Sequence, residues 1–342
     1  MEMSGHLLYI DITQICGIGC SFCMYADRHQ TSAQFELSDR ARTNISGLVN
    51  HSKVKRVSIS GEGEPLNNVK VFQAILGLSR GNVAFEFITS GFLPHDQLNK
   101  FFDETETIVK AHGDTCNVRL SADSYHIEKI RHRPHGVSML RSVSAPKGPL
   151  TFSFRSVDTD RAFTRSYLLD EAKKYLGKAE IIELSPLEDR LVVGERVFNI
   201  DYKSHVHPTD DVPASRLDLL GYIQAIESRI GKRFTFGSLN PAPLLNGLDL
   251  TIKPDGVVAL YGIENVTLGN IHTDHFSWES LVRRVADDPL MRCLHTTPLL
   301  DVLARVGDQE AMQLLARKAN NPYWLVKEVA KHPAILEQFA SA

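Results

Sequence analysis

Short β-rich runs alternate with amphipathic stretches through the first half of this sequence, and that alternation constrains the fold more than any other feature. The stretches between the runs carry apolar residues at helical spacing, as Ala41, Ile45 and Leu48 do. Alternating strands and helices predict βα units and a parallel sheet. The six predicted strands are residues 7–13, 56–61, 85–91, 118–123, 150–157 and 179–187.

Six βα units predict an α/β fold in which the parallel strands form an open or partial (β/α)6 barrel. The predicted strands end in polar or small residues, namely Thr13, Ser60, Ser90, Ser121 and Ser185. Parallel α/β proteins place their chemistry at the carboxyl edge of the sheet. We therefore expect the functional site at these strand ends.

The pattern changes after about residue 190. Residues 249–263 predict a hairpin turned by Pro-Asp-Gly, and from Trp278 onward the chain is almost continuously helical in pattern. The sequence thus predicts a barrel domain over residues 1–200. A smaller α+β extension with a helical tail is predicted over residues 201–342.

Composition narrows the possible partners and location. The 342 residues are 43% apolar and carry a formal net charge of -3, which favours a soluble globular protein without the basic surface that nucleic acids require. The N-terminus lacks a basic region, and its apolar run of a few residues indicates a first strand, not a signal peptide. We expect a cytoplasmic protein that binds neither nucleic acid nor membrane.

Three of the five cysteines fall in the stretch Cys16-x3-Cys20-x2-Cys23. A structural zinc site normally has four protein ligands, but Cys116 and Cys293 are solitary in the sequence. An iron-sulfur cluster held by three thiolates instead leaves one iron open to a substrate or cofactor. A structural metal site or three ordinary buried thiols are the alternatives.

This spacing, with Phe22 directly before the third cysteine, resembles the motif of the radical S-adenosylmethionine (radical SAM) enzymes. The resemblance implies a 4Fe-4S cluster on Cys16, Cys20 and Cys23, with S-adenosylmethionine on its open iron. It also implies an external one-electron reductant such as flavodoxin or ferredoxin, and cleavage of S-adenosylmethionine to a 5'-deoxyadenosyl radical.

Further motifs match this family in order along about 190 residues. "SISGEGEP" is similar to its Gly-Gly-Glu motif, "FITSG" to its Thr-Asn-Gly segment, and "RLSAD" to its Ser-x-Asp strand. The resemblance assigns contacts with S-adenosylmethionine to Phe22, Gly63, Glu64, Ser90, Ser121 and Asp123. Alternatives that need no cofactor are a turn carboxylate for Glu64, and a polar strand end and helix cap for Ser121 and Asp123.

The second half resembles the SPASM or twitch extension of some radical SAM enzymes. The hairpin, the "LGNI" of residues 268–271 and the following helix all match, but Tyr261 or Gly262 stands near the place of the expected cysteine. Too few cysteines remain for an auxiliary cluster. We therefore predict a SPASM-like scaffold that serves as a lid or substrate wall without such a cluster.

Without an auxiliary cluster to accept an electron, a redox-neutral reaction such as epimerisation is favoured. A thiol can return a hydrogen atom to a substrate radical, and Cys293 in the extension is the candidate donor. Cys116 lies at the start of its predicted strand, which is the wrong end of a parallel barrel. Either cysteine is alternatively a small core side chain.

The expected substrate is a small polar molecule, such as a sugar, nucleoside or nucleotide of a natural-product pathway. Peptide-modifying members commonly carry a recognition domain before the barrel, whereas the first strand here is predicted within the first ten residues. Arg155 and the basic run of residues 131–135 are candidates to meet phosphate or hydroxyl groups. The alternatives are dehydrogenation, sulfur insertion or radical carbon-carbon coupling, and a non-catalytic iron-sulfur sensor.

Overall fold

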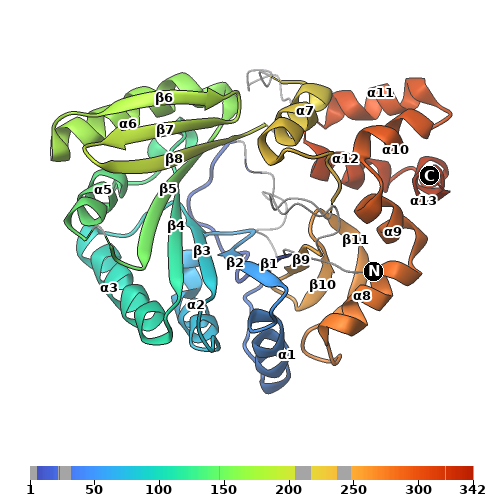
Figure 1. Cartoon of the computed structure of the whole chain (residues 1–342), viewed down its shortest axis with the longest axis horizontal. Helices are drawn as coiled ribbons and strands as arrows, with labels where there is room; N and C mark the ends of the chain where they lie inside the picture. Colours follow the sequence, from blue (N-terminus) through green and yellow to red (C-terminus); the bar gives the residue numbers. More distant parts are fainter. Residues whose placement is uncertain are drawn as a thin grey trace. The chain divides into compact units, whose positions relative to one another are not determined.

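Strands and helices alternate through the chain as the sequence predicts, and they are distributed over two units (Figure 1). Unit 1 comprises Met1–Ile10, Leu37–Val57 and Ser204–Ala342, and unit 2 comprises Asp11–Glu36 and Ser58–Lys203. The computed structural model describes residues 6–21, 23, 32–145, 147–204, 217–236, 248–319 and 321–341. The functional boundary predicted at residue 200 stays a prediction.

Unit 2 contains the carboxyl half of the strand β2 (Val54–Ser60) and most of the predicted βα units. Its further strands are β3 (Ala84–Thr89), β4 (Thr115–Ser121), β5 (Leu150–Val157), β6 (Glu180–Ser185), β7 (Glu188–Val193) and β8 (Arg196–Lys203). Its helices are η2 (Pro65–Asn68), α2 (Val69–Leu76), α3 (His95–His112), α4 (Ser124–Ile127), α5 (His135–Ser144), η3 (Asp158–Asp160) and α6 (Arg161–Leu176).

The sheet of unit 2 corrects the predicted sixth strand. The order is β3-β4-β5-β8-β7-β6, so the strand that pairs in parallel with β5 is β8. The predicted strand over residues 179–187 is β6, which lies at the sheet edge and pairs antiparallel with β7. Two alternating runs around Gly194 form the β7-β8 hairpin, and this insertion separates β6 from the parallel strands.

Aromatic and aliphatic side chains form the core between the sheet of unit 2 and its helices. Helix α3 buries Leu98, Phe101 and Phe102 along one face, because these positions recur at helical spacing. The Phe101 ring centroid lies 5.1 Å from that of Phe87 on β3, and the Phe102 centroid lies 5.0 Å from that of Phe152 on β5. This packing leaves the opposite face of these strands for polar side chains.

Unit 1 contains β1 (His6–Asp11) through Ile10, the start of β2, and the predicted extension. Its sheet has the order β11-β10-β9-β1-β2, and the predicted hairpin is confirmed as the antiparallel pair β9-β10. The other strands are β9 (Leu250–Ile252), β10 (Val257–Leu260) and β11 (Ile263–Asn270). The helices are α1 (Asp39–Val49), α7 (Leu219–Ile230), α8 (Trp278–Asp287), α9 (Pro289–Thr296), α10 (Leu299–Arg305), α11 (Gln309–Lys318), α12 (Pro322–Val329) and α13 (Pro333–Ser341).

The helical tail predicted from Trp278 onward is confirmed, and it begins with a capping box in which Ser277 and Ser280 exchange hydrogen bonds. Helix α1 is fixed to the segment before this cap through Asn44, which is 1% exposed. The Asn44 side-chain amide donates to the carbonyl oxygen of Ile271 at 2.9 Å and accepts from the Phe276 N–H at 3.1 Å. In the described part of the chain, no helix combines the length and apolar character needed to cross a membrane.

Candidate functional site

The three clustered cysteines lie on one loop of unit 2 that follows β1. Cys16, Cys20 and Cys23 are all partly exposed, and the loop is closed by a hydrogen bond from the Cys23 N–H to the carbonyl oxygen of Cys20 at 3.1 Å. Phe22 lies outside the described residues. The loop therefore presents three accessible sulfur atoms at the carboxyl end of a strand, where the sequence predicts the site.

The environment of Cys16 favours a metal-bound thiolate over a free one. Burial is the main cause that raises the pKa of the Cys16 thiol, and the nearby Glu64 carboxylate raises it further. The backbone N–H groups of Ile18 and Gly19 donate to the sulfur and act in the opposite direction. Iron would supply the positive charge that this thiol needs to ionise, and N–H···S bonds are a known means of adjusting iron-sulfur clusters.

The "GEGEP" turn after β2 packs directly on the cysteine loop. The Gly63 N–H donates to the Thr13 carbonyl oxygen, and the Glu64 N–H donates to the Ile15 carbonyl oxygen, each at 2.9 Å. A Cβ atom at Gly63 would lie 2.3 Å from that Ile15 oxygen, so only glycine fits here. The close approach that glycine permits is thus to the cysteine loop, and its contact with S-adenosylmethionine stays a prediction.

Glu64 is 4% exposed and its carboxylate is surrounded by donors from the protein itself. Oε1 accepts from the Leu66 N–H at 3.1 Å and from the Thr89 hydroxyl. Oε2 accepts from the N–H and the hydroxyl of Ser90, at 2.9 and 2.6 Å. Four donors match the four acceptor positions of a carboxylate, so Glu64 joins the ends of β2 and β3. The contacts with S-adenosylmethionine predicted for Glu64 and Ser90 would have to share these groups.

Glu62 is a second buried carboxylate of the same turn, and the sequence analysis did not single it out. It is 4% exposed, and its Oε2 accepts from the Gln14 side-chain amide at 2.6 Å. The repeated Gly-Glu pattern of "GEGEP" contained two candidate carboxylates, and the family motif directed attention to the second. Glu62 is therefore a further group with which the turn can orient a ligand.

Asp123 holds His126 against the cysteine loop. Asp123 is 3% exposed and caps α4, with its Oδ1 accepting from the His126 N–H at 3.0 Å and lying 2.7 Å from the His126 Nδ1. The His126 side chain is also hydrogen-bonded to Cys20. Although burial lowers the pKa of His126, the charge and hydrogen bond of Asp123, followed by Cys20, raise it to about 10. The structure thus confirms the helix-cap alternative for Asp123 and connects it to a cysteine.

Ser121 ends β4, as predicted, and its backbone is held by a buried histidine. The carbonyl oxygen of Ser121 lies 3.0 Å from the Nε2 of His135, whose Nδ1 lies 2.8 Å from the Tyr167 hydroxyl. Because a carbonyl oxygen only accepts, Nε2 carries the proton and Tyr167 donates to Nδ1. This arrangement fixes the strand end, while the predicted contact of the Ser121 hydroxyl with S-adenosylmethionine stays untested.

The two solitary cysteines are buried core side chains. Cys116 is the second residue of β4 and is fully buried, which confirms its place at the start of that strand and raises the pKa of its thiol. Cys293 lies on α9 and is 6% exposed, next to the buried Leu294. The predicted role of Cys293 as a hydrogen-atom donor therefore stays a prediction.

Aromatic rings pack where the extension was compared with a cysteine-bearing hairpin. The Tyr261 ring centroid lies 5.1 Å from that of Tyr9 and 5.2 Å from that of Tyr323. A Cβ atom at Gly262 would lie 2.0 Å from the Tyr323 ring, so the ring is in close contact with the hairpin backbone. This part of unit 1 is stabilised by edge-to-face packing of tyrosines.

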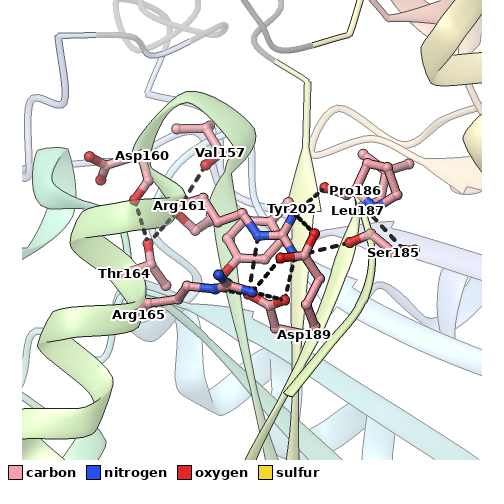
Figure 2. A network of polar contacts seen from close by, with 12 residues as sticks. Val157, Asp160, Arg161, Thr164, Arg165, Ser185, Pro186, Leu187, Asp189 and Tyr202 are labelled. Atoms are coloured by element: carbon pink, nitrogen blue, oxygen red, sulfur yellow. Dashed lines mark hydrogen bonds and ion pairs between the residues drawn. The ribbon is translucent and has the colours of Figure 1, made fainter. Parts of the chain in front are cut away.

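A network of buried ion pairs joins α6 to the β6–β8 meander in unit 2, as Figure 2 shows. Asp189 is fully buried, and its carboxylate contacts Arg161, accepts from Arg165 at 2.7 and 2.8 Å and accepts from the Tyr202 hydroxyl at 2.7 Å. Arg161 also donates to the Ser185 carbonyl oxygen at 3.0 Å. All the oxygen atoms of Asp189 have protein donors, so this network is structural.

The cysteine loop fits a cluster better than a single metal ion. No three histidine, cysteine, aspartate or glutamate side chains converge on one ion position within the described ranges. The three thiolates of a 4Fe-4S cluster bind three different irons, so they need not converge on one point. Cys16, Cys20 and Cys23, with backbone N–H donors and His126 beside them, could hold such a cluster.

The comparisons with known proteins agree with this fold. No family model and no curated protein matches the sequence. The structure of native anSMEcpe with bound AdoMet and Cp18Cys peptide matches with a TM-score of 0.53 and 13% identity, covering 98% of this chain and 96% of that one. The chain therefore has a radical SAM fold with a C-terminal extension, whose barrel is partial.

Two further structures of anSMEcpe are similar with lower scores. The His6-tagged protein with bound AdoMet has a TM-score of 0.49 and 14% identity, and covers 98% of this chain and 96% of its own. The native protein with bound AdoMet and Kp18Cys peptide has a TM-score of 0.47 and 14% identity, with 81% and 80% covered. Both TM-scores lie below 0.5, so the likeness of fold depends on the first structure.

Proposed function

We propose that this protein is a radical SAM enzyme. The observation that supports the proposal most is the meeting of motifs that are far apart in the sequence. The Cys16–Cys23 loop packs on the Gly61–Glu64 turn, Glu64 binds Thr89 and Ser90 at the end of β3, and His126 after β4 contacts Cys20. These are the motifs in which the sequence resembles the family, and they occupy one edge of a fold shared with an AdoMet-bound structure.

The residues of this chain would hold the two cofactors and orient them. Cys16, Cys20 and Cys23 would bind a 4Fe-4S cluster, and Phe22, Gly63, Glu64, Ser90, Ser121 and Asp123 are the proposed surroundings of S-adenosylmethionine. When both are bound and an external reductant such as flavodoxin or ferredoxin supplies an electron, they provide a 5'-deoxyadenosyl radical that removes a hydrogen atom from the substrate. Glu62 and Glu64 then offer the negative charge that suits an amino group.

The proposed substrate is a small polar molecule of a natural-product pathway, with epimerisation or another redox-neutral rearrangement as the outcome and Cys293 as the candidate hydrogen donor. Dehydrogenation, sulfur insertion and carbon-carbon coupling are the rival reactions, and product mass separates all of them from epimerisation. The peptide held by the neighbouring structure makes a peptide the rival substrate class. A non-catalytic iron-sulfur sensor is the rival from outside the enzymes.

Anaerobic reconstitution with iron and sulfide tests the proposal. We expect about four irons per chain, and formation of 5'-deoxyadenosine from S-adenosylmethionine under reducing conditions. Replacing Cys16, Cys20 and Cys23 together by alanine should abolish both. The matched control is C116A, which removes a thiol outside the loop and should keep both.

Two outcomes would contradict the proposal. Zinc in place of iron would indicate a structural metal protein. A loaded cluster that never cleaves S-adenosylmethionine would indicate the sensor.

A further inference from the structure

The inner face of the sheet in unit 2 carries charged side chains at matched positions of neighbouring strands. In register, Ser121 of β4 lies beside Arg155 of β5, and Arg155 lies beside Asp201 of β8. Arg119 and Lys203 lie two residues away along their own strands, so all of them face the same side. The intervening residues, such as Phe154, are buried on the helix-covered side.

The deeper part of this face is neutralised within the protein. The Arg119 guanidinium lies 3.1 Å from the Glu86 carboxylate and 3.8 Å from that of Asp201, and the Arg119 side chain is 11% exposed. Glu86 also accepts from the Ser58 hydroxyl at 2.6 Å. These groups form a buried polar floor in which each carboxylate has a cation nearby.

The part at the carboxyl edge has a different balance of charge. Arg155 and Lys203 lie close enough to repel one another: burial, followed by the charge of Arg155, lowers the pKa of Lys203 to about 8. Asp123 and Cys23 act on Lys203 in the opposite direction, which places this lysine beside the cysteine loop. Two buried cations near one another are stabilised by an anion that contacts both.

We propose that Arg155 and Lys203 bind a phosphate group of the substrate. This inference rests on the proposed function, and it narrows the small polar substrate to a phosphorylated one. A planar guanidinium and an ammonium together match a tetrahedral dianion in charge and in hydrogen-bond geometry. Arg119 positions the site from below, because its ion pairs fix the floor of the same sheet face.

The location fits a substrate subsite. Both cations stand at the carboxyl ends of parallel strands, where α/β enzymes bind their ligands. The effect of Cys23 on Lys203 shows that a molecule held there lies near the proposed cluster. A phosphate at this position would anchor a small substrate while leaving its carbon atoms free to face the cofactor.

Calorimetric titration of the anaerobically reconstituted protein, saturated with S-adenosylmethionine, tests the site. The probes are inorganic phosphate, ribose 5-phosphate and, for comparison, ribose. We expect phosphate and ribose 5-phosphate to bind and ribose to bind much more weakly. R155Q and K203Q should each weaken the binding of both phosphates about tenfold or more, whereas K173Q, on the exposed side of α6, should not.

Three results would overturn the inference: no binding of either phosphate, equal binding by the variants, or loss of S-adenosylmethionine affinity in R155Q and K203Q with phosphate binding intact. The last result would assign the two cations to the carboxylate of S-adenosylmethionine. Iron content and 5'-deoxyadenosine formation are measured on the same samples. The phosphate titration is repeated on cluster-free protein, so failure of the proposed function and failure of the phosphate site are distinguishable.

Discussion

At the scale of single residues, the site is built from carboxylates that hold other groups in place. Glu64 receives four hydrogen bonds from the ends of two segments, and Asp123 fixes the ring of His126. Neither carboxylate is merely a ligand awaiting a cofactor. Both determine where neighbouring groups lie, so replacing either one would disturb the loop as well as any direct contact with S-adenosylmethionine.

His126 gives a residue-scale prediction, which rests on the proposed cluster. A hydrogen bond to a cluster thiolate stabilises the reduced and more negative state, and Asp123 holds His126 in place to make that bond. H126L should therefore lower the midpoint potential of the cluster while iron content is kept. Redox titration followed by electron paramagnetic resonance measures the shift.

The matched control for this experiment is H132Q, which changes a histidine on the neighbouring loop that has no recorded contact with the cysteines. Its midpoint potential should equal that of the wild type. An unchanged potential in H126L, with full iron content, would show that His126 has no influence on the cluster.

At the scale of the elements, the β6–β8 meander extends the parallel sheet and is fastened to α6 by the Asp189 network (Figure 2). Arg161 and Arg165 are successive turns of one helix face, so both guanidinium groups reach the same carboxylate. The pKa of Asp189 is lowered by these arginines and Tyr202, although burial acts to raise it. Because β8 carries Lys203, this network also supports the proposed phosphate site.

Replacing Asp189 gives the element-scale prediction. D189N leaves two arginines without their shared buried carboxylate, which should lower the free energy of unfolding by about 3 kcal/mol. Urea unfolding at neutral pH measures the change. The control is E183Q, since Glu183 contacts the same arginines but its side chain is 56% exposed, and its effect should stay below about 1 kcal/mol. Equal effects of the two variants would contradict a buried structural role for Asp189.

At the scale of the whole molecule, each unit contains one buried histidine that is neutral in the folded state. Burial lowers the pKa of His135 in unit 2 to about 3 and that of His295 in unit 1 to about 4. An unfolded chain protonates histidine near pH 6.5. The stabilisation is therefore complete above pH 6.5 and is lost as the pH falls through the folded-state values.

The resulting prediction concerns stability in mild acid. Between pH 6.5 and about 4, each of these histidines should lower the free energy of unfolding by about 1.4 kcal/mol per pH unit. In H135Q the slope should be shallower than in the wild type by about that amount. Urea unfolding at a series of pH values measures both slopes, with K110Q on the surface of α3 as the control. Parallel slopes for H135Q and the wild type would contradict the prediction.

Local patterns in the sequence were sufficient for the order of the elements and for the cysteine loop. Strand and helix periodicity, the Pro-Asp-Gly hairpin and the spacing of Cys16, Cys20 and Cys23 all depend on residues close together in the chain. The β7-β8 hairpin could also have been predicted from its alternating runs around Gly194. Its omission led to the wrong sixth parallel strand.

Only the tertiary structure decided which groups meet. The four donors to Glu64 come from segments 25 and 26 residues away as well as from its own turn. The contact of His126 with Cys20 and the juxtaposition of Arg155 with Lys203 likewise join strands and loops far apart in the chain. Sequence spacing sets the local conformation, but partners across a sheet depend on strand order and register, which result from the packing of the whole unit.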